Sequence, residues 1–205
     1  MKKNYLTLYK IAFGLLGFSA LITEIVATGQ KGIFNPANFF SYFTVESNIL
    51  AVIAFLLGAL AIYSGKKIKG VDLFRGAATF YMVVTGIVFA VLLSGLDVEL
   101  TAVPWDNIVL HYIIPVAIAV DWLLDHPVHR IAFKKALVWA VFPVAYLAYS
   151  LIRGANVGWY PYPFLDPTNG YGPVAVVSVA ILIFALVLIF LVTRIGEPAT
   201  SAKKK

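Results

Sequence analysis

The chain has 205 residues, of which 61% are hydrophobic and only 13% are charged. Soluble domains are about 45–50% apolar and about 25% charged, so a soluble protein of this size is unable to bury so much apolar surface. The absence of cysteine excludes disulfides, thiolate catalysis and cysteine-ligated metal sites. The composition therefore predicts a polytopic membrane protein.

Six segments have the length and composition of membrane-spanning helices, each needing about 20 mostly apolar residues. They are residues 9–28, 39–64, 76–96, 105–124, 133–152 and 172–193. The first follows Met1-Lys2-Lys3, as in a signal peptide, but its apolar run is too long and no small-residue cleavage site ends it. We expect an all-α fold with one six-helix transmembrane domain over residues 1–195 and a basic cytoplasmic tail over 196–205.

Lysine and arginine alternate between the two sides of these spans. One side holds only Lys31 and Arg153, and the other holds Lys2, Lys3, Lys10, Lys66, Lys67, Lys69, Arg75, Arg130, Lys134, Lys135, Arg194, Lys203, Lys204 and Lys205. Basic residues favour the cytoplasmic side, so both termini are predicted to be cytoplasmic. The net charge of +6 then reflects topology and contact with anionic membrane lipids, and no nucleic-acid partner is expected.

The longest outer connection, residues 153–171, alternates aromatic residues with prolines between Gly158 and Pro167. Such a composition predicts a rigid, mostly extended loop at the level of the lipid headgroups. Two interpretations stay open. The loop forms an interfacial aromatic belt, which we favour slightly, or it covers a site.

The second span carries polar residues that hydrocarbon does not favour, and these are functional-site candidates by default. On a helix Thr44, Ser47 and Asn48 share one face, whereas Glu46 points elsewhere. The second and fourth spans run in the same direction, and Thr44 and His111 each lie on the order of 8–9 Å from the predicted helix start. We therefore expect them to share a depth in the outer leaflet.

Two further residues reach this layer: Glu24, near the end of the first span, and Asn107, one turn before His111. Asp121 lies about 15 Å deeper than His111 and is predicted to pair with a basic residue at the inner surface. The candidates for that partner are Arg130, Lys134 and Lys135.

A hydroxyl nucleophile needs a base within hydrogen-bond reach, and the base benefits from an orienting carboxylate. Thr44 is the candidate nucleophile and His111 the candidate base. The orienting carboxylate is Glu46 or Glu24. A donor for a developing oxyanion comes from Asn48 or Asn107. Purely structural roles stay open for the same residues. The threonine can bond the carbonyl one turn back, and the histidine can bridge two helices. The carboxyls can be protonated or hydrated, and Ser47 and Asn48 can form contacts between helices.

Metal and haem sites are not expected. His126 and His129 lie at the inner membrane surface with Pro127 between them, and the membrane layer holds a single histidine. A zinc hydrolase normally uses three protein ligands, and a bis-histidine haem needs two histidines. We expect no cofactor.

Three short segments carry a resemblance: FTVESN at 43–48, NIVLHYIIP at 107–115 and YPFLD at 162–166. In order and topological placement they resemble the androgen-induced-gene family, and the chain looks like a bacterial relative, which implies an integral protein of a bacterial inner membrane. Animal members are atypical threonine hydrolases that cleave fatty acid esters of hydroxy fatty acids. The resemblance implies Thr44 as the nucleophile and His111 as its general base, with Glu46 at the acidic position two residues after the threonine.

The first functional hypothesis is an integral membrane esterase that takes a lipid ester from the outer leaflet. The alternative is a small proton- or cation-coupled transporter or channel subunit, in which Glu24, Glu46 and His111 form a relay that Asp121 extends inward. A third is a lipid-binding protein without turnover. Thr44 Oγ1 and His111 within about 3–4 Å in a pocket that opens to lipid would favour the esterase.

Overall fold

The computed structural model describes residues 2–65, 68, 70–96 and 101–195, and all regular structure in these ranges is helical. In these ranges six continuous helical spans are long and apolar enough to cross a membrane. They are α1 (Lys2–Gln30); α3 (Phe43–Ser64); α4 (Val71–Val88) with η1 (Phe89–Leu93); α5 (Pro104–Ile108) with η2 (Val109–Ile113) and α6 (Ile114–Leu124); α7 (Phe133–Ala136) with η3 (Leu137–Ala140) and α8 (Val141–Val157); and α9 (Tyr171–Ile195). This confirms the predicted all-α, six-span fold of an integral, multi-pass membrane protein.

The start of the second span differs from the prediction. Asn35 caps a separate short helix, α2 (Pro36–Phe39), by accepting a hydrogen bond from the Asn38 amide at 3.1 Å. The chain then turns, and α3 begins at Phe43 rather than at residue 39. Thr44 is therefore in the first turn of α3, and the expected distance of roughly 8–9 Å between Thr44 and the helix start was wrong. The first residues of α3 are nevertheless buried, because α3 begins inside the bundle.

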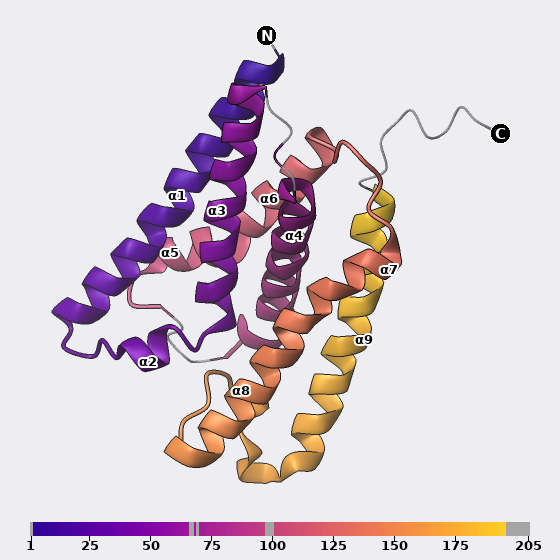
Figure 1. The fold of residues 1–205 in the computed structure, drawn as a ribbon. Coiled ribbons are helices and arrows are strands. Elements are labelled where there is room, and N and C mark those ends of the chain that lie inside the picture. Colours follow the sequence, from indigo (N-terminus) through magenta and orange to yellow (C-terminus); the bar gives the residue numbers. More distant parts are fainter. Residues whose placement is uncertain (1, 66–67, 69, 97–100, 196–205) are drawn as a thin grey trace.

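The bundle has two parts that share α4 (Figure 1). α1, α3 and α6 pack around one side of α4, which contributes Ala78 and Met82 to that core. α8 and α9 lie on its other side, where α4 contributes Phe80, Tyr81 and Val84. Buried residues make up 61% of the most apolar stretch of the α4 span, but only 17% of that of the α8 span and 22% of that of α9. α8 and α9 therefore present most of their surface to lipid.

The connection between α8 and α9 turns into the bundle. Gly158, with φ of +68°, ends α8 in a left-handed conformation, and the short turns η4 (Pro163–Leu165) and η5 (Pro167–Asn169) follow. Tyr162 and Leu165 are buried. The segment is thus not a simple aromatic belt at the surface, because its central residues contact the helices that it covers.

Charged residues at the predicted cytoplasmic end form a buried network. Asp121 lies 2.5 Å from Lys10 Nζ and 3.0 Å from Arg75 Nη2, and both cations lie 2.9 Å from Asp125. Asp72 pairs with Arg75 at 3.3 Å. The prediction that Asp121 pairs with Arg130, Lys134 or Lys135 was therefore wrong. α1 and α4 both meet α6 at this level, and a buried carboxylate requires close cations.

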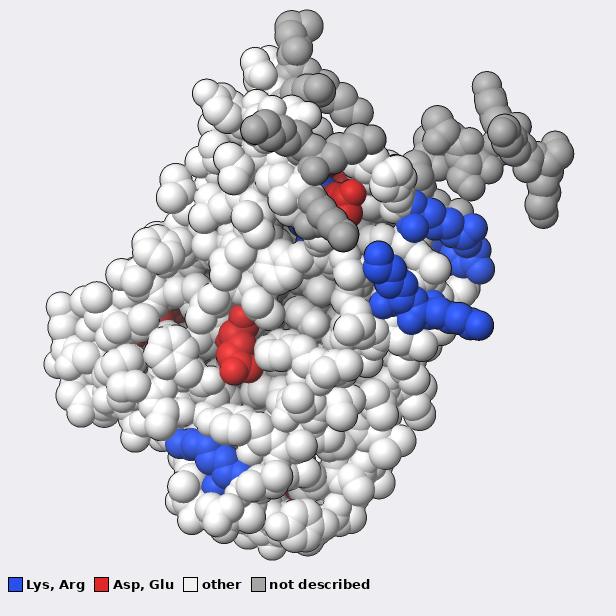
Figure 2. Space-filling model, viewed as in Figure 1, with Lys and Arg blue, Asp and Glu red and all other residues white. Residues whose placement is uncertain are grey.

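Exposed basic side chains remain at the same end of the molecule. On the face in Figure 2 several gather beside α7 and the end of α9, while acidic side chains are few. Lys66, Lys67, Lys69 and the predicted basic tail over 196–205 lie outside the described residues. The topology with both termini cytoplasmic stays a prediction.

Candidate functional site

Thr44 lies at the meeting point of three segments. Its Oγ1 is 3.3 Å from His111 Nε2, on η2, and 3.3 Å from the hydroxyl of Tyr162, in the loop between α8 and α9. The Thr44 main-chain amide donates to the same Tyr162 hydroxyl at 3.2 Å. All three residues are buried. This amide is free to do so because the first N–H groups of a helix have no partner within the helix.

The hydrogen bonds of His111 determine its tautomer. Its Nδ1 lies 3.1 Å from the main-chain carbonyl of Asn107, which is only able to accept a hydrogen bond. Nδ1 therefore carries a proton. Because His111 is buried and a buried cation without a paired charge is costly, the ring is neutral, and Nε2 presents a lone pair to Thr44 Oγ1. The ring of Phe89 stacks on the imidazole, with centroids 3.9 Å apart. The hydroxyl of Thr44 thus donates to a neutral imidazole held in one orientation.

His111 lies in a single π-helical turn, a feature that is frequent at functional sites. The Ile114 amide bonds the Val109 carbonyl, five residues back. Pro115 follows and has no N–H, so it cannot continue this pattern to the Leu110 carbonyl. That carbonyl instead accepts from Asn48 Nδ2 at 3.1 Å.

Asn48 joins the two halves of the site. Its Nδ2 also donates to the Thr44 carbonyl at 2.9 Å, so one side chain holds the Thr44 turn of α3 against the His111 turn of η2. Both amide protons are used in this way. The prediction that Asn48 supplies an oxyanion donor is therefore corrected: its geometry is that of a positioning residue.

Asn107 likewise does not offer a donor to Thr44. It acts through its main-chain carbonyl on His111, and its side-chain Oδ1 is buried without a partner among the described residues. Ser47 faces α4 instead, where its Oγ lies 2.9 Å from Thr85 Oγ1 and also donates to the Phe43 carbonyl. The polar face of α3 thus divides between the site and a contact between helices.

The two carboxylates proposed to orient His111 do not bond it. Glu24 accepts from the Ala102 amide at 2.8 and 3.1 Å and lies beside the fully buried Asp106. Glu46 has a buried Oε2 without a partner in the described part of the chain. The carbonyl of Asn107 takes the place that the sequence analysis gave to a carboxylate.

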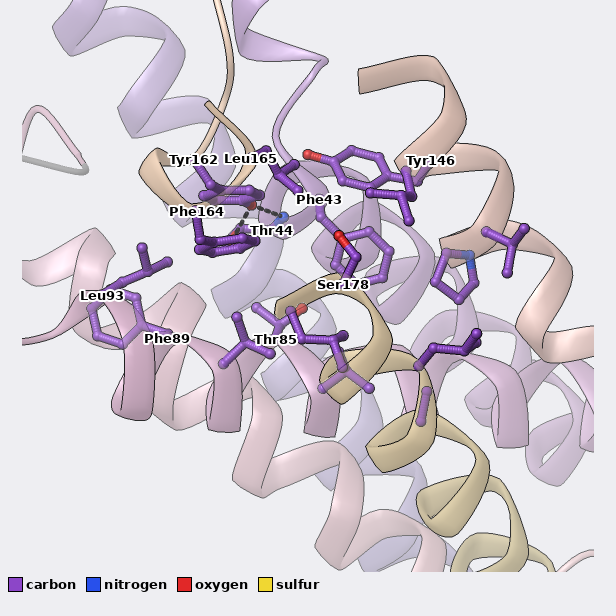
Figure 3. A pocket seen from close by; sticks show the side chains of 18 residues that line it. Phe43, Thr44, Thr85, Phe89, Leu93, Tyr146, Tyr162, Phe164, Leu165 and Ser178 are labelled. Atoms are coloured by element: carbon purple, nitrogen blue, oxygen red, sulfur yellow. Dashed lines mark hydrogen bonds between the residues drawn. The ribbon is translucent and has the colours of Figure 1, made fainter. Parts of the chain in front are cut away.

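Two cavities border Thr44. The larger, about 190 Å³, is almost entirely apolar and lies between α4, α8 and α9 (Figure 3). Thr44 and Tyr162 lie at its edge. The smaller, about 40 Å³, is lined by Thr44, His111, Tyr162 and Glu24 and exceeds the roughly 10–15 Å³ that a water molecule requires.

The small cavity adjoins a wider one toward the predicted outer surface. This outer cavity, about 210 Å³, shares Glu24, Phe39, Tyr42 and Thr101 with it and is also lined by Lys31. Thr44 thus borders an apolar cavity and a second, smaller cavity that shares lining residues with the outer one. An ester bond placed at Thr44 has room for an acyl chain and for water.

Tyr162 is the residue that the sequence analysis missed. Its loop was singled out, and its motif contributed to the resemblance, but no pattern indicated that the hydroxyl reaches Thr44. The only sequence signal is that this loop and the start of α3 lie on the same predicted side of the membrane.

Comparisons of the chain with protein-family models, with curated proteins and with solved structures found no match.

Proposed function

We propose that this protein is an integral membrane lipid esterase in which Thr44 is the nucleophile and His111 the general base. The observation that carries the proposal is the 3.3 Å contact between Thr44 Oγ1 and the unprotonated Nε2 of a buried, neutral histidine. A nucleophile next to an oriented base is the arrangement that acyl transfer requires.

In the first step Oγ1 attacks the ester carbonyl carbon, the carbon–oxygen π pair moves to the carbonyl oxygen, and Nε2 takes the hydroxyl proton. The tetrahedral intermediate collapses, the bond to the alkoxy group breaks, and Nε2 returns the proton to the leaving alkoxide. Water then attacks the acyl-threonine, with His111 again as base, and releases a carboxylic acid. The Asn107 carbonyl stabilises the Nδ1–H of the imidazolium throughout.

The substrate class follows from the large cavity. Its lining is apolar, and it includes Val144 and Leu182, which are 49% and 40% exposed on the faces of α8 and α9. An apolar cavity reached from a surface that lipid covers favours an acyl chain that enters laterally. We propose a fatty acyl ester, with esters of hydroxy fatty acids as the first substrates to test.

The motif resemblance supports the same residues independently of the geometry. The positions that it implies, Thr44 and His111, are 67 residues apart in the chain and adjacent in the site. We therefore propose a relationship to the androgen-induced-gene family of threonine hydrolases.

The transport alternative gains no specific support. In that alternative Asp121 extends the relay toward the cytoplasm, and the carboxylate of Asp121 is instead held between Lys10 and Arg75. A lipid-binding protein without turnover uses the same cavity, so turnover itself must be measured.

The decisive experiment uses purified protein in detergent and a fluorophosphonate probe, with the labelled residue located by peptide mass spectrometry. Thr44→Ala should lose labelling, and Thr44→Ala and His111→Ala should each lose hydrolysis of a hydroxy-fatty-acid ester. Thr79→Ala is the matched control, because Thr79 is a buried threonine that bonds the carbonyl one turn back. A folded wild type that takes no label and cleaves no ester contradicts the proposal.

A further inference from the structure

The protons of the site can be assigned one by one. The Thr44 hydroxyl proton points to His111 Nε2, which has a lone pair and no proton. The Thr44 amide proton points to the Tyr162 oxygen. The remaining contact, between Tyr162 OH and Thr44 Oγ1 at 3.3 Å, therefore has the phenol as its donor.

The phenol is held in place and stays protonated. Its ring stacks on Phe164, with centroids 5.2 Å apart and planes 7° apart, and it meets Tyr42 edge to face. Figure 3 shows the stacked pair at the edge of the apolar cavity, with the hydroxyl directed at Thr44. Burial raises the pKa of Tyr162 to about 12, so the phenol is neutral and able to donate at physiological pH.

Other donors at this point are already occupied. The amides of Val45 and Glu46 donate to the Tyr42 carbonyl at 3.0 and 3.2 Å, and both amide protons of Asn48 are used on carbonyls. A tetrahedral intermediate at Thr44 nevertheless needs a donor about 2.7–3.1 Å from its oxyanion. Among the groups described around Oγ1, the phenol of Tyr162, 3.3 Å from Oγ1, is the donor that an adjacent oxyanion can take over.

We propose that Tyr162 is a third catalytic residue, which donates its phenol hydrogen bond to the ester carbonyl oxygen as that oxygen becomes negative. In the resting site the phenol donates to Oγ1. When the Oγ1 lone pair forms the bond to carbon, this hydrogen bond is released, and the carbonyl oxygen lies next to the phenol. No proton leaves Tyr162. The inference rests on the proposed esterase function.

The test compares wild type, Tyr162→Phe and Tyr160→Phe, using a medium-chain p-nitrophenyl ester and a trifluoromethyl ketone of matched chain length. The ketone forms an oxyanion on the nucleophile without turnover. Loss of one oxyanion donor should lower kcat about 100-fold to 1,000-fold in Tyr162→Phe and weaken ketone inhibition similarly. KM should change less than about threefold, because the interaction forms only in the transition state. Tyr160→Phe, altered in the same loop, should match wild type.

A second measurement tests the role of Tyr162 even if Tyr162→Phe fails to fold. Replacing Tyr162 with a fluorinated tyrosine keeps its shape and acidifies the phenol, which should move the alkaline limb of the kcat profile to lower pH. An unmoved limb, or a folded Tyr162→Phe with kcat within about twofold of wild type, overturns the role of Tyr162 while leaving the Thr44 and His111 esterase intact. A wild type without labelling or turnover overturns both proposals.

Discussion

Asn48 and Pro115 are coupled through one carbonyl. Because the turn before the proline is π-helical and the proline has no N–H, position 115 gives the Leu110 carbonyl no amide donor, and the side chain of Asn48 donates to it instead. The same side chain bonds the Thr44 carbonyl. The carbonyl that Pro115 leaves available therefore binds Asn48, and the two hydrogen bonds of Asn48 align the nucleophile on α3 with the base on η2.

Asn48→Ala should reduce turnover without removing either catalytic group. The Thr44 and His111 turns lose their shared hydrogen-bond partner, and a small misplacement should lower kcat about 10-fold to 100-fold. The buried Leu110 carbonyl left without a partner should also cost about 1–3 kcal/mol of stability. Steady-state kinetics and thermal unfolding in detergent check the two effects. Ser47→Ala, which removes the neighbouring contact with Thr85, should retain kcat, and equal losses in both variants would refute the positioning role.

Ala185→Phe should change the chain length that the enzyme prefers. Ala185 is buried in α9 and lines the apolar cavity, so a phenyl ring there shortens the space for an acyl chain. Hydrolysis of long-chain p-nitrophenyl esters should fall, with shorter esters much less affected. Ala180→Phe places the same ring on an exposed position of α9 and should leave the chain-length profile unchanged. A uniform loss across chain lengths would argue against this cavity as the acyl site.

Asp121→Asn should destabilise the fold and spare the chemistry. The carboxylate compensates Lys10 and Arg75 in a buried network, and breaking one partner of a buried ion pair typically costs about 3–5 kcal/mol. The melting temperature should fall, while turnover per folded molecule stays close to wild type. A double-mutant cycle with Lys10→Met should give a coupling energy that identifies the pair. Proton flux in liposomes that depends on Asp121 would instead favour the transport alternative.

The ionisation of Tyr162 should appear in stability at alkaline pH. Its pKa is raised from 10.0 to about 12 by burial, so the folded state retains the phenol proton more strongly than the unfolded state does. This contribution is fully present below pH 10 and is lost as pH rises toward 12. Wild type should therefore lose melting temperature over that range more steeply than Tyr162→Phe. Parallel curves for the two proteins would contradict a buried, neutral phenol.

The six spans were predictable because a helix in hydrocarbon must satisfy its own backbone hydrogen bonds, which requires long apolar stretches that are visible in composition. The expectation that Thr44 and His111 lie at one level also followed from topology, although the start of α3 was misplaced. The local signals Asn35 and Pro36 cap and begin a separate short helix, and a hydropathy pattern does not resolve that break.

The hydrogen-bond and ion-pair partners of the polar residues did not follow from the sequence. Which side chain meets Asp121, what orients His111, and whether Tyr162 reaches Thr44 depend on the rotation of each helix and on the path of a loop that turns inward. Sequence spacing measures position along one helix, whereas hydrogen bonds between helices depend on distances across several. The sequence alone determined a six-span membrane protein with reactive side chains at one level. Only the tertiary structure decided which of them touch, because packing sets distances to a fraction of an ångström.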